Sequence, residues 1–128
     1  MRLRMFVSDG PEFDGELFTN PVASQLVLRL PLTLTFSDFN GVEKVATLDA
    51  PLSMEGVQGA ESPQPGEIGY YAPTRGLVLY YGHVGKWPGL VRVGRFTLPI
   101  AKLRELPDGV VIRIAQASRP DECSRTHS

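Results

Sequence analysis

Every tyrosine of this chain lies within residues 69–82, as the pairs Tyr70–Tyr71 and Tyr80–Tyr81. The Pro-Thr-Arg-Gly segment between the pairs is typical of a hairpin turn. Neighbouring residues on a strand face opposite sides, so one ring of each pair should face the core and the other should face out. A buried phenol hydroxyl needs a hydrogen-bond partner, and clustered hydroxyls can orient the carbonyl or carboxylate of a ligand. We therefore expect one ring of each pair to be structural and the other to line a groove.

A second candidate for chemistry is the adjacent pair Glu43 and Lys44. On a strand these side chains point to opposite faces, so one of them must face the interior or a covering loop. A carboxylate in that position would have a perturbed pKa, which makes Glu43 a candidate acid or base. The simpler interpretation, which we expect here, is a structural ion pair between Glu43 and an arginine of a neighbouring strand, such as Arg92.

Further candidates are ligand contacts. Arg92 lies on an apolar strand beside the loop that holds the single tryptophan, Trp87. An arginine next to an aromatic loop is suited to bidentate binding of a carboxylate. We predict that Phe36, Tyr71, Tyr81, Trp87 and Arg92 contact a ligand.

Composition excludes several function classes. The 128 residues suit a single domain, and a formal net charge of −1 without a basic run argues against nucleic-acid binding. We expect no membrane partner, because no apolar run reaches the ~18–20 residues of a span. The single cysteine, Cys123, allows no internal disulfide, and we expect neither a metal nor a cofactor. With no recognisable signal peptide, the sequence predicts a cytoplasmic protein.

The elements that would position these residues are short and closely spaced. Alternating or apolar runs predict strands at 1–7, 16–18, 32–36, 42–48, 90–96 and 110–115, besides the two strands of the tyrosine hairpin. Helices are predicted to begin at Asn20-Pro21, ending before Pro31, and at Pro99. Residues 49–66 are expected to be a surface excursion. About eight strands and two short helices predict a mainly β protein, a closed antiparallel barrel with a helix capping each end. This domain spans 1–116, and 117–128 is predicted to be a disordered tail.

Three segments resemble the cyclophilin-like domain family, a group of small bacterial and archaeal proteins. Residues 66–73, Gly-Glu-Ile-Gly-Tyr-Tyr-Ala-Pro, and 77–82, Leu-Val-Leu-Tyr-Tyr-Gly, are similar to its central hairpin. Residues 30–41, followed by Glu43-Lys44, resemble its other marked segment, and residues 90–95 resemble its passage from strand to second helix. The resemblance covers residues 1–116 and implies an eight-stranded barrel capped by two helices.

The resemblance implies no particular activity. Peptidyl-prolyl isomerases of this fold place an arginine after a Phe-His pair, and this chain contains no Phe-His-Arg triplet. The similar small proteins form a family without an established activity. We therefore expect a binding module that holds a small molecule or extended peptide in a groove beside residues 69–82, with homodimerisation as a further possibility. The alternatives are a metal-free isomerase or lyase acting on a small metabolite, with Glu43 as acid or base and a tyrosine as proton donor, and a prolyl isomerase in which Arg92 replaces the missing arginine.

Overall fold

A computed structural model describes residues 1–57 and 59–117 of the chain. The predicted disordered tail, apart from Ala117, lies outside these residues, as do Cys123 and His127. None of the helices in the described ranges has the length and apolar character needed to cross a membrane.

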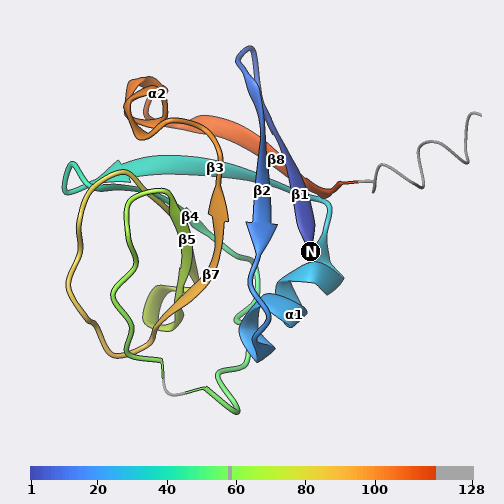
Figure 1. Cartoon of the computed structure of the whole chain (residues 1–128), viewed down its shortest axis with the longest axis vertical. Helices are drawn as coiled ribbons and strands as arrows, with labels where there is room; N and C mark the ends of the chain where they lie inside the picture. Colours follow the sequence, from blue (N-terminus) through green and yellow to red (C-terminus); the bar gives the residue numbers. More distant parts are fainter. Residues whose placement is uncertain (58, 118–128) are drawn as a thin grey trace, which may run out of the picture.

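Eight antiparallel strands form a closed barrel, as predicted, in the order β1-β2-β7-β5-β6-β4-β3-β8 (Figure 1). The strands are β1 Arg2–Val7, β2 Glu12–Leu17, β3 Leu32–Phe39, β4 Glu43–Thr47, β5 Glu67–Tyr71, β6 Gly76–Tyr80, β7 Leu90–Phe96 and β8 Val110–Gln116. The helices are α1 Pro21–Arg29, α2 Ile100–Glu105 and the short 3-10 helix η1 Ala72–Thr74. The second strand begins earlier than residue 16, because Phe13, Gly15 and Leu17 alternate inward and pair it with β1 over most of its length.

The two α-helices lie on opposite sides of the barrel in Figure 1 and contribute apolar residues to its core. Helix α1 begins where the sequence predicts, with the Asn20 side chain accepting a hydrogen bond from the Ala23 N–H at 2.8 Å. Its buried face holds Val22, Ala23 and Leu26. Helix α2 buries Leu103. The barrel interior is therefore filled by side chains and contains its own packed core.

The outer face of the barrel carries a second, smaller apolar cluster. Strand β6 is buried at every position, so both of its faces are covered. Val78, Tyr80 and Leu90 form this cluster on the outer face, with Tyr71 and Val84 packed against it. Val84 belongs to loop 81–89, which arches outside the strands at the left of Figure 1. An apolar face beneath a loop is the setting in which a surface cavity can form.

The segment 49–66 is tied to the barrel more closely than a plain surface excursion. Leu52 is buried, and its N–H donates a hydrogen bond to the Tyr70 hydroxyl at 2.9 Å. Met54 and Val57 also pack against the main core. Tyr70 thus obtains the partner that a buried phenol requires.

A tight turn sets the register between β3 and β4. Asn40 and Gly41 both have positive φ, and the Val42 N–H donates to the Phe39 carbonyl at 3.2 Å. Two central residues of positive φ are the signature of the type I′ turn, which matches the twist of a hairpin. The resulting register places Asp38 opposite Lys44 and Phe39 opposite Glu43.

Candidate functional site

The four tyrosines divide between the two faces of the barrel, as strand alternation predicts. Tyr70 is fully buried in the main core, and Tyr81 is buried there too, with its hydroxyl donating to the Asp38 carboxylate at 3.0 Å. Tyr71 and Tyr80 face the other way and belong to the outer cluster. Tyr70 and Tyr81 are therefore structural, whereas Tyr71 and Tyr80 face a cavity.

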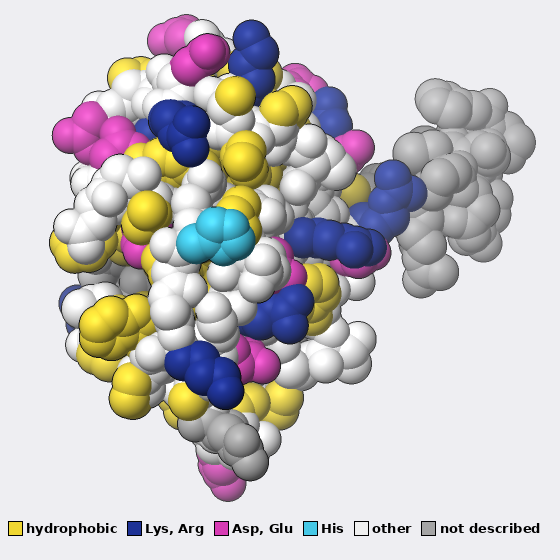
Figure 2. All heavy atoms as spheres, turned by 60° about the vertical axis from the view of Figure 1, so that its left-hand side comes forward, with side chains coloured by type: hydrophobic (Ala, Val, Ile, Leu, Met, Phe, Trp, Pro, Cys, Tyr) yellow, Lys and Arg dark blue, Asp and Glu magenta, His cyan; other side chains and the backbone are white. Residues whose placement is uncertain are grey.

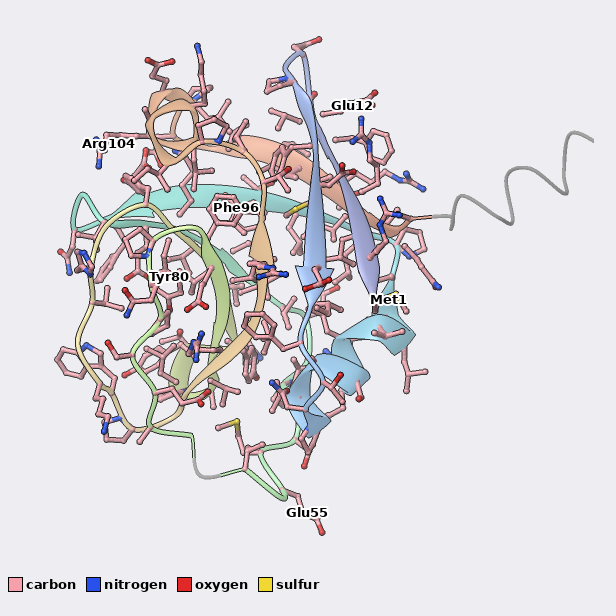
Figure 3. The ribbon with its side chains drawn as sticks, viewed as in Figure 1. Met1, Glu12, Glu55, Tyr80, Phe96 and Arg104 are labelled. Carbon is pink, nitrogen blue, oxygen red and sulfur yellow. The ribbon has the colours of Figure 1, made fainter. Side chains whose placement is uncertain are left out.

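This cavity lies between loop 81–89, the β3–β4 turn and the outer face of the sheet, and has a volume of about 550 Å³. Figure 3 shows Tyr80 on the side of the barrel enclosed by the loop, and Figure 2 shows hydrophobic side chains around the histidine drawn in cyan. The volume lies within the range of small-molecule sites. Its lining residues are Phe39, Asn40, Val42, Glu43, Tyr71, Tyr80, His83, Val84, Gly85, Trp87 and Leu90.

Glu43 provides the acidic group of the cavity. It stands directly across from Tyr80 in the β4–β6 register and is partly buried. Among the described residues, its carboxylate has neither an ion-pair partner nor a hydrogen-bond donor. Burial without a compensating charge raises the pKa of Glu43. The expected ion pair between Glu43 and Arg92 is wrong, because Arg92 is engaged elsewhere.

Tyr80 supplies a phenol beside this carboxylate. Burial raises the pKa of Tyr80, and the negative charge of Glu43 raises it further, so the hydroxyl stays protonated at neutral pH. The hydroxyl has no hydrogen-bond partner among the described residues. Every fully buried side-chain polar atom in the described ranges has such a partner, so the Tyr80 hydroxyl is open to the cavity. A protonated phenol that remains available can donate a hydrogen bond to a ligand.

A glycine makes room for the Tyr80 ring. A Cβ atom placed on Gly69 would lie 2.7 Å from Tyr80 Cε2 and 2.9 Å from its hydroxyl oxygen. These distances are shorter than any ordinary contact, so the ring rests directly on the Gly69 backbone. The position of the Tyr80 hydroxyl therefore depends on the absence of a side chain at residue 69.

Arg92 pairs with Glu67 instead of Glu43. Its Nε donates to Glu67 Oε1 at 2.8 Å, and a terminal nitrogen donates to Oε2, so the contact is bidentate. The guanidinium also lies 5.5 Å from the centre of the Phe18 ring. Burial alone would raise the pKa of Glu67, but the hydrogen bonds from Arg92 and from the Gln64 N–H hold it below its usual value. Arg92 thus binds a carboxylate bidentately, as predicted, but this carboxylate belongs to Glu67 and not to a ligand.

On the inner side of the same strands, an ionic network fixes the cavity wall. Lys44 has no exposed area, and its Nζ donates to Asp38 Oδ1 at 2.7 Å and to the Leu106 carbonyl at 2.9 Å. Tyr81 donates to the same carboxylate oxygen. Lys44 follows Glu43 and Tyr81 follows Tyr80 in the chain, so this network anchors the backbone that carries both polar groups of the cavity.

The structure brings only some of the predicted site residues together. Glu43, Tyr71 and Trp87 line the cavity. Phe36 is completely buried in the main core, Tyr81 faces the interior, and Arg92 lies outside the lining and is paired with Glu67.

Several lining residues escaped the sequence analysis. Tyr80 shares a face of β6 with Val78, and all residues of this strand are buried. This alternation could have indicated that Tyr80 lies in an apolar cluster on the outer face. Phe39 and Asn40 belong to a turn, and His83 to a loop without periodicity, so no sequence pattern placed them. No group of three or more His, Cys, Asp or Glu side chains in the described ranges is arranged to hold a metal ion.

The geometry so far defines a class: a small closed β-barrel with a packed interior and a ligand-sized cavity on its outer face. The model of the cyclophilin-like family matches residues 6–115, which is most of the sequence. The chain therefore belongs to the cyclophilin-like family.

A solved structure shares the fold. The solution structure of a hypothetical protein from Archaeoglobus fulgidus aligns with a TM-score of 0.68, covering 91% of this chain and 95% of the other. The two sequences are 18% identical, so the likeness concerns the fold alone. No curated protein matches the sequence.

Proposed function

We propose that this protein is a binding module that holds a small molecule, or a short segment of an extended peptide, in the outer cavity beside the tyrosine hairpin. The observation that carries the proposal is the juxtaposition of aromatic walls with two polar groups, Glu43 and Tyr80, that have no internal partner among the described residues. Ligand sites are typically apolar cavities with a few convergent polar groups. Every fully buried side-chain polar atom in the described ranges has a hydrogen-bond partner, so the unpaired atoms of Glu43 and Tyr80 are open to the cavity, where a ligand can complete them.

The proposal is tested by fragment screening with amide-detected NMR on the whole chain. Fragments that bind the cavity should shift the amide signals of residues 39–43 and 80–90. Tyr71→Ala and Trp87→Ala should weaken their binding at least tenfold while the circular dichroism spectrum stays native. Leu28, which is 85% exposed on α1, provides the control Leu28→Ala for loss of an exposed apolar side chain. Unchanged fragment affinity in Tyr71→Ala and Trp87→Ala would refute the cavity as the binding site.

A second candidate function is metal-free acid–base catalysis on a small metabolite. It is favoured by the position of Glu43 directly opposite Tyr80, because a carboxylate of raised pKa can accept a proton while a neutral phenol stabilises a developing oxyanion. Proton removal from carbon followed by reprotonation at another position would give isomerase chemistry, and proton removal with departure of a leaving group from the neighbouring carbon would give lyase chemistry.

The test of catalysis is incubation of the protein with a mixture of carbonyl metabolites in D₂O. Proton NMR should then show exchange of C–H hydrogens next to a carbonyl, and this exchange should disappear in Glu43→Gln. Absence of exchange for every compound that binds would leave the binding module as the function. Prolyl isomerisation finds no support, because the Arg92 guanidinium is occupied by Glu67 and does not line the cavity.

A further inference from the structure

The cavity has few charged residues in its lining. Of its lining residues, Glu43 is the only one with a carboxylate, and none is a lysine or an arginine. Lys86, the basic residue of loop 81–89, is exposed and is not part of the lining. The cavity therefore presents one negative charge and no fixed positive charge.

Two other carboxylates near these strands, the exposed Asp38 and the buried Glu67, each have a cation of their own. Asp38 is paired with Lys44 at 2.7 Å, and Glu67 is paired with Arg92. Desolvating an ionised carboxylate is costly unless an opposite charge or several donors compensate it. Glu43 has neither among the described residues, so its charge is open to compensation by a cation that enters the cavity.

The walls around Glu43 suit a cation as well. Four aromatic residues, Phe39, Tyr71, Tyr80 and Trp87, line the cavity. Phe39 and Trp87 are more than half exposed, at 56% and 55%, although large aromatic side chains are usually buried. Aromatic faces carry partial negative charge and attract ammonium groups, and cages of such rings are a known means of binding organic cations.

We propose that the outer cavity binds a small organic cation, an alkyl- or arylalkylammonium ion, with Glu43 as its counter-ion and the aromatic residues as its walls. The inference rests on the proposed function, since it names the ligand class of the same cavity. An anion would meet the Glu43 carboxylate with only the imidazole of His83, and no lysine or arginine, among the lining residues to compensate it. A neutral ligand can donate a hydrogen bond to Glu43 but brings no charge to compensate the carboxylate.

Three probes of nearly equal size test the inference: 2-phenylethylammonium, 2-phenylethanol and phenylacetate, which carry positive, zero and negative charge at pH 7.5. Titrations followed by amide NMR shifts should show at least tenfold tighter binding of the ammonium ion than of the alcohol, with phenylacetate the weakest. In Glu43→Gln, which keeps the side-chain shape, the ammonium ion and the alcohol should bind within about twofold of each other.

The matched control is Glu55→Gln. It makes the same change in net charge at an exposed residue that lies far from Tyr80 in Figure 3. This variant should keep the preference for the ammonium ion. If Glu43→Gln is not folded, Glu43→Asp provides a second test, because withdrawing the carboxylate by one methylene should weaken the ammonium ion more than the alcohol.

The outcomes separate the two proposals. Equal binding of the ammonium ion and the alcohol by the wild-type protein, or tightest binding of phenylacetate, would overturn the inference while leaving a functional cavity. Binding of none of the three probes, when other fragments bind and depend on Tyr71, would also overturn only the ligand class. If no fragment of any charge binds the cavity, the proposed function fails together with this inference.

Discussion

Glu43 and Glu67 lie on neighbouring parts of the same barrel wall, and they differ in nearly every physical respect. Glu67 is held by two hydrogen bonds from Arg92, and its pKa is lowered. Glu43 is partly buried without a partner among the described residues, and its pKa is raised. The position of one arginine decides the difference, since Arg92 stands opposite Gly69 on β5 and reaches the carboxylate of β5, not that of β4. The completed ion pair makes Glu67 a structural residue, whereas the unpaired carboxylate of Glu43 is the group on which the proposed site rests.

The largest effect should come from breaking the completed pair. Arg92→Leu leaves the Glu67 carboxylate, whose side chain is 12% exposed, without its cation. The free energy of unfolding at pH 7 should fall by about 2–3 kcal/mol, measured by urea denaturation. The double variant Arg92→Leu/Glu67→Gln should recover part of the loss. Equal stability of Arg92→Leu and the wild-type protein would contradict the structural role of the pair.

The same pair gives a pH dependence of defined sign. Because the pKa of Glu67 is lower in the folded protein, the unfolded chain binds more protons as the solution becomes acidic. The contribution of the pair to stability is therefore fully present when the pH is above the ordinary glutamate pKa. It is lost as the pH falls through the lower pKa that Glu67 has in the folded protein. Denaturation from pH 6 to pH 3 should show this loss in the wild-type protein and a smaller one in Arg92→Leu.

A smaller effect is expected from Gly69, which stands opposite Arg92 and contacts the Tyr80 ring. Gly69→Ala would place a Cβ 2.7 Å from the Tyr80 ring and force the ring towards the cavity. Unfolding free energy should fall by about 1–2 kcal/mol, and affinity for cavity fragments should fall with it. Gly85→Ala is the stability control, because a Cβ there meets nothing within 4 Å. If Gly69→Ala is as stable as Gly85→Ala, the contact between ring and backbone is not tight.

Neutralising the unpaired carboxylate should have a smaller and opposite effect. The raised pKa of Glu43 means that the folded protein binds more protons than the unfolded chain just above the ordinary glutamate value, so ionisation of Glu43 destabilises the fold. Glu43→Gln should therefore raise the free energy of unfolding at pH 7 by less than about 1 kcal/mol. The gain should vanish below the ordinary glutamate pKa, and Glu55→Gln should show no such pattern. Destabilisation by Glu43→Gln at pH 7 would mean that the ionised carboxylate has a partner.

The difference between Glu43 and Glu67 can also be measured directly, without a substitution that destabilises the protein. Side-chain carboxyl ¹³C shifts followed by NMR from pH 2 to pH 8 should show Glu43 titrating above the ordinary glutamate pKa and Glu67 titrating below it. A His83→Asn background removes the imidazole of the cavity from the titration, and Tyr80 stays protonated throughout this range. Identical titration of the two carboxyl groups would remove the distinction on which the proposed site depends.

Much of the fold could be predicted because it depends on local patterns. Alternating runs located the strands, and Asn20-Pro21 located the start of α1. Alternation also predicted that one ring of each tyrosine pair faces the core, although Tyr81, which was predicted as a ligand contact, is the core-facing member of its pair and Tyr80 lines the cavity. The segment 49–66 was harder, because the contact of Leu52 with Tyr70 joins parts of the chain that no local pattern connects.

The site was less predictable, since it depends on which strands become neighbours. Sequence alternation could show that Glu43 and Arg92 lie on strands, but the barrel order places β6 and β5 between β4 and β7. Because of that order, Arg92 lies within reach of Glu67, and Glu43 stands opposite Tyr80. Phe36 failed as a predicted contact residue for a similar reason, because it alternates into the packed interior of the closed barrel.

The turn at Asn40 and Gly41 has a consequence for how such proteins diverge. Residues 43 and 44 have opposite charges and opposite faces, so one residue inserted or deleted in this turn would exchange them. Lys44 would then enter the cavity, and the carboxylate of Glu43 would be buried beside Asp38. A change in the length of one turn, with no substitution elsewhere, would thus reverse the charge of the cavity and disrupt the ionic network inside the barrel. We expect natural relatives that keep an acidic-basic pair here to keep this turn at a constant length, and relatives with a longer turn to have replaced both residues.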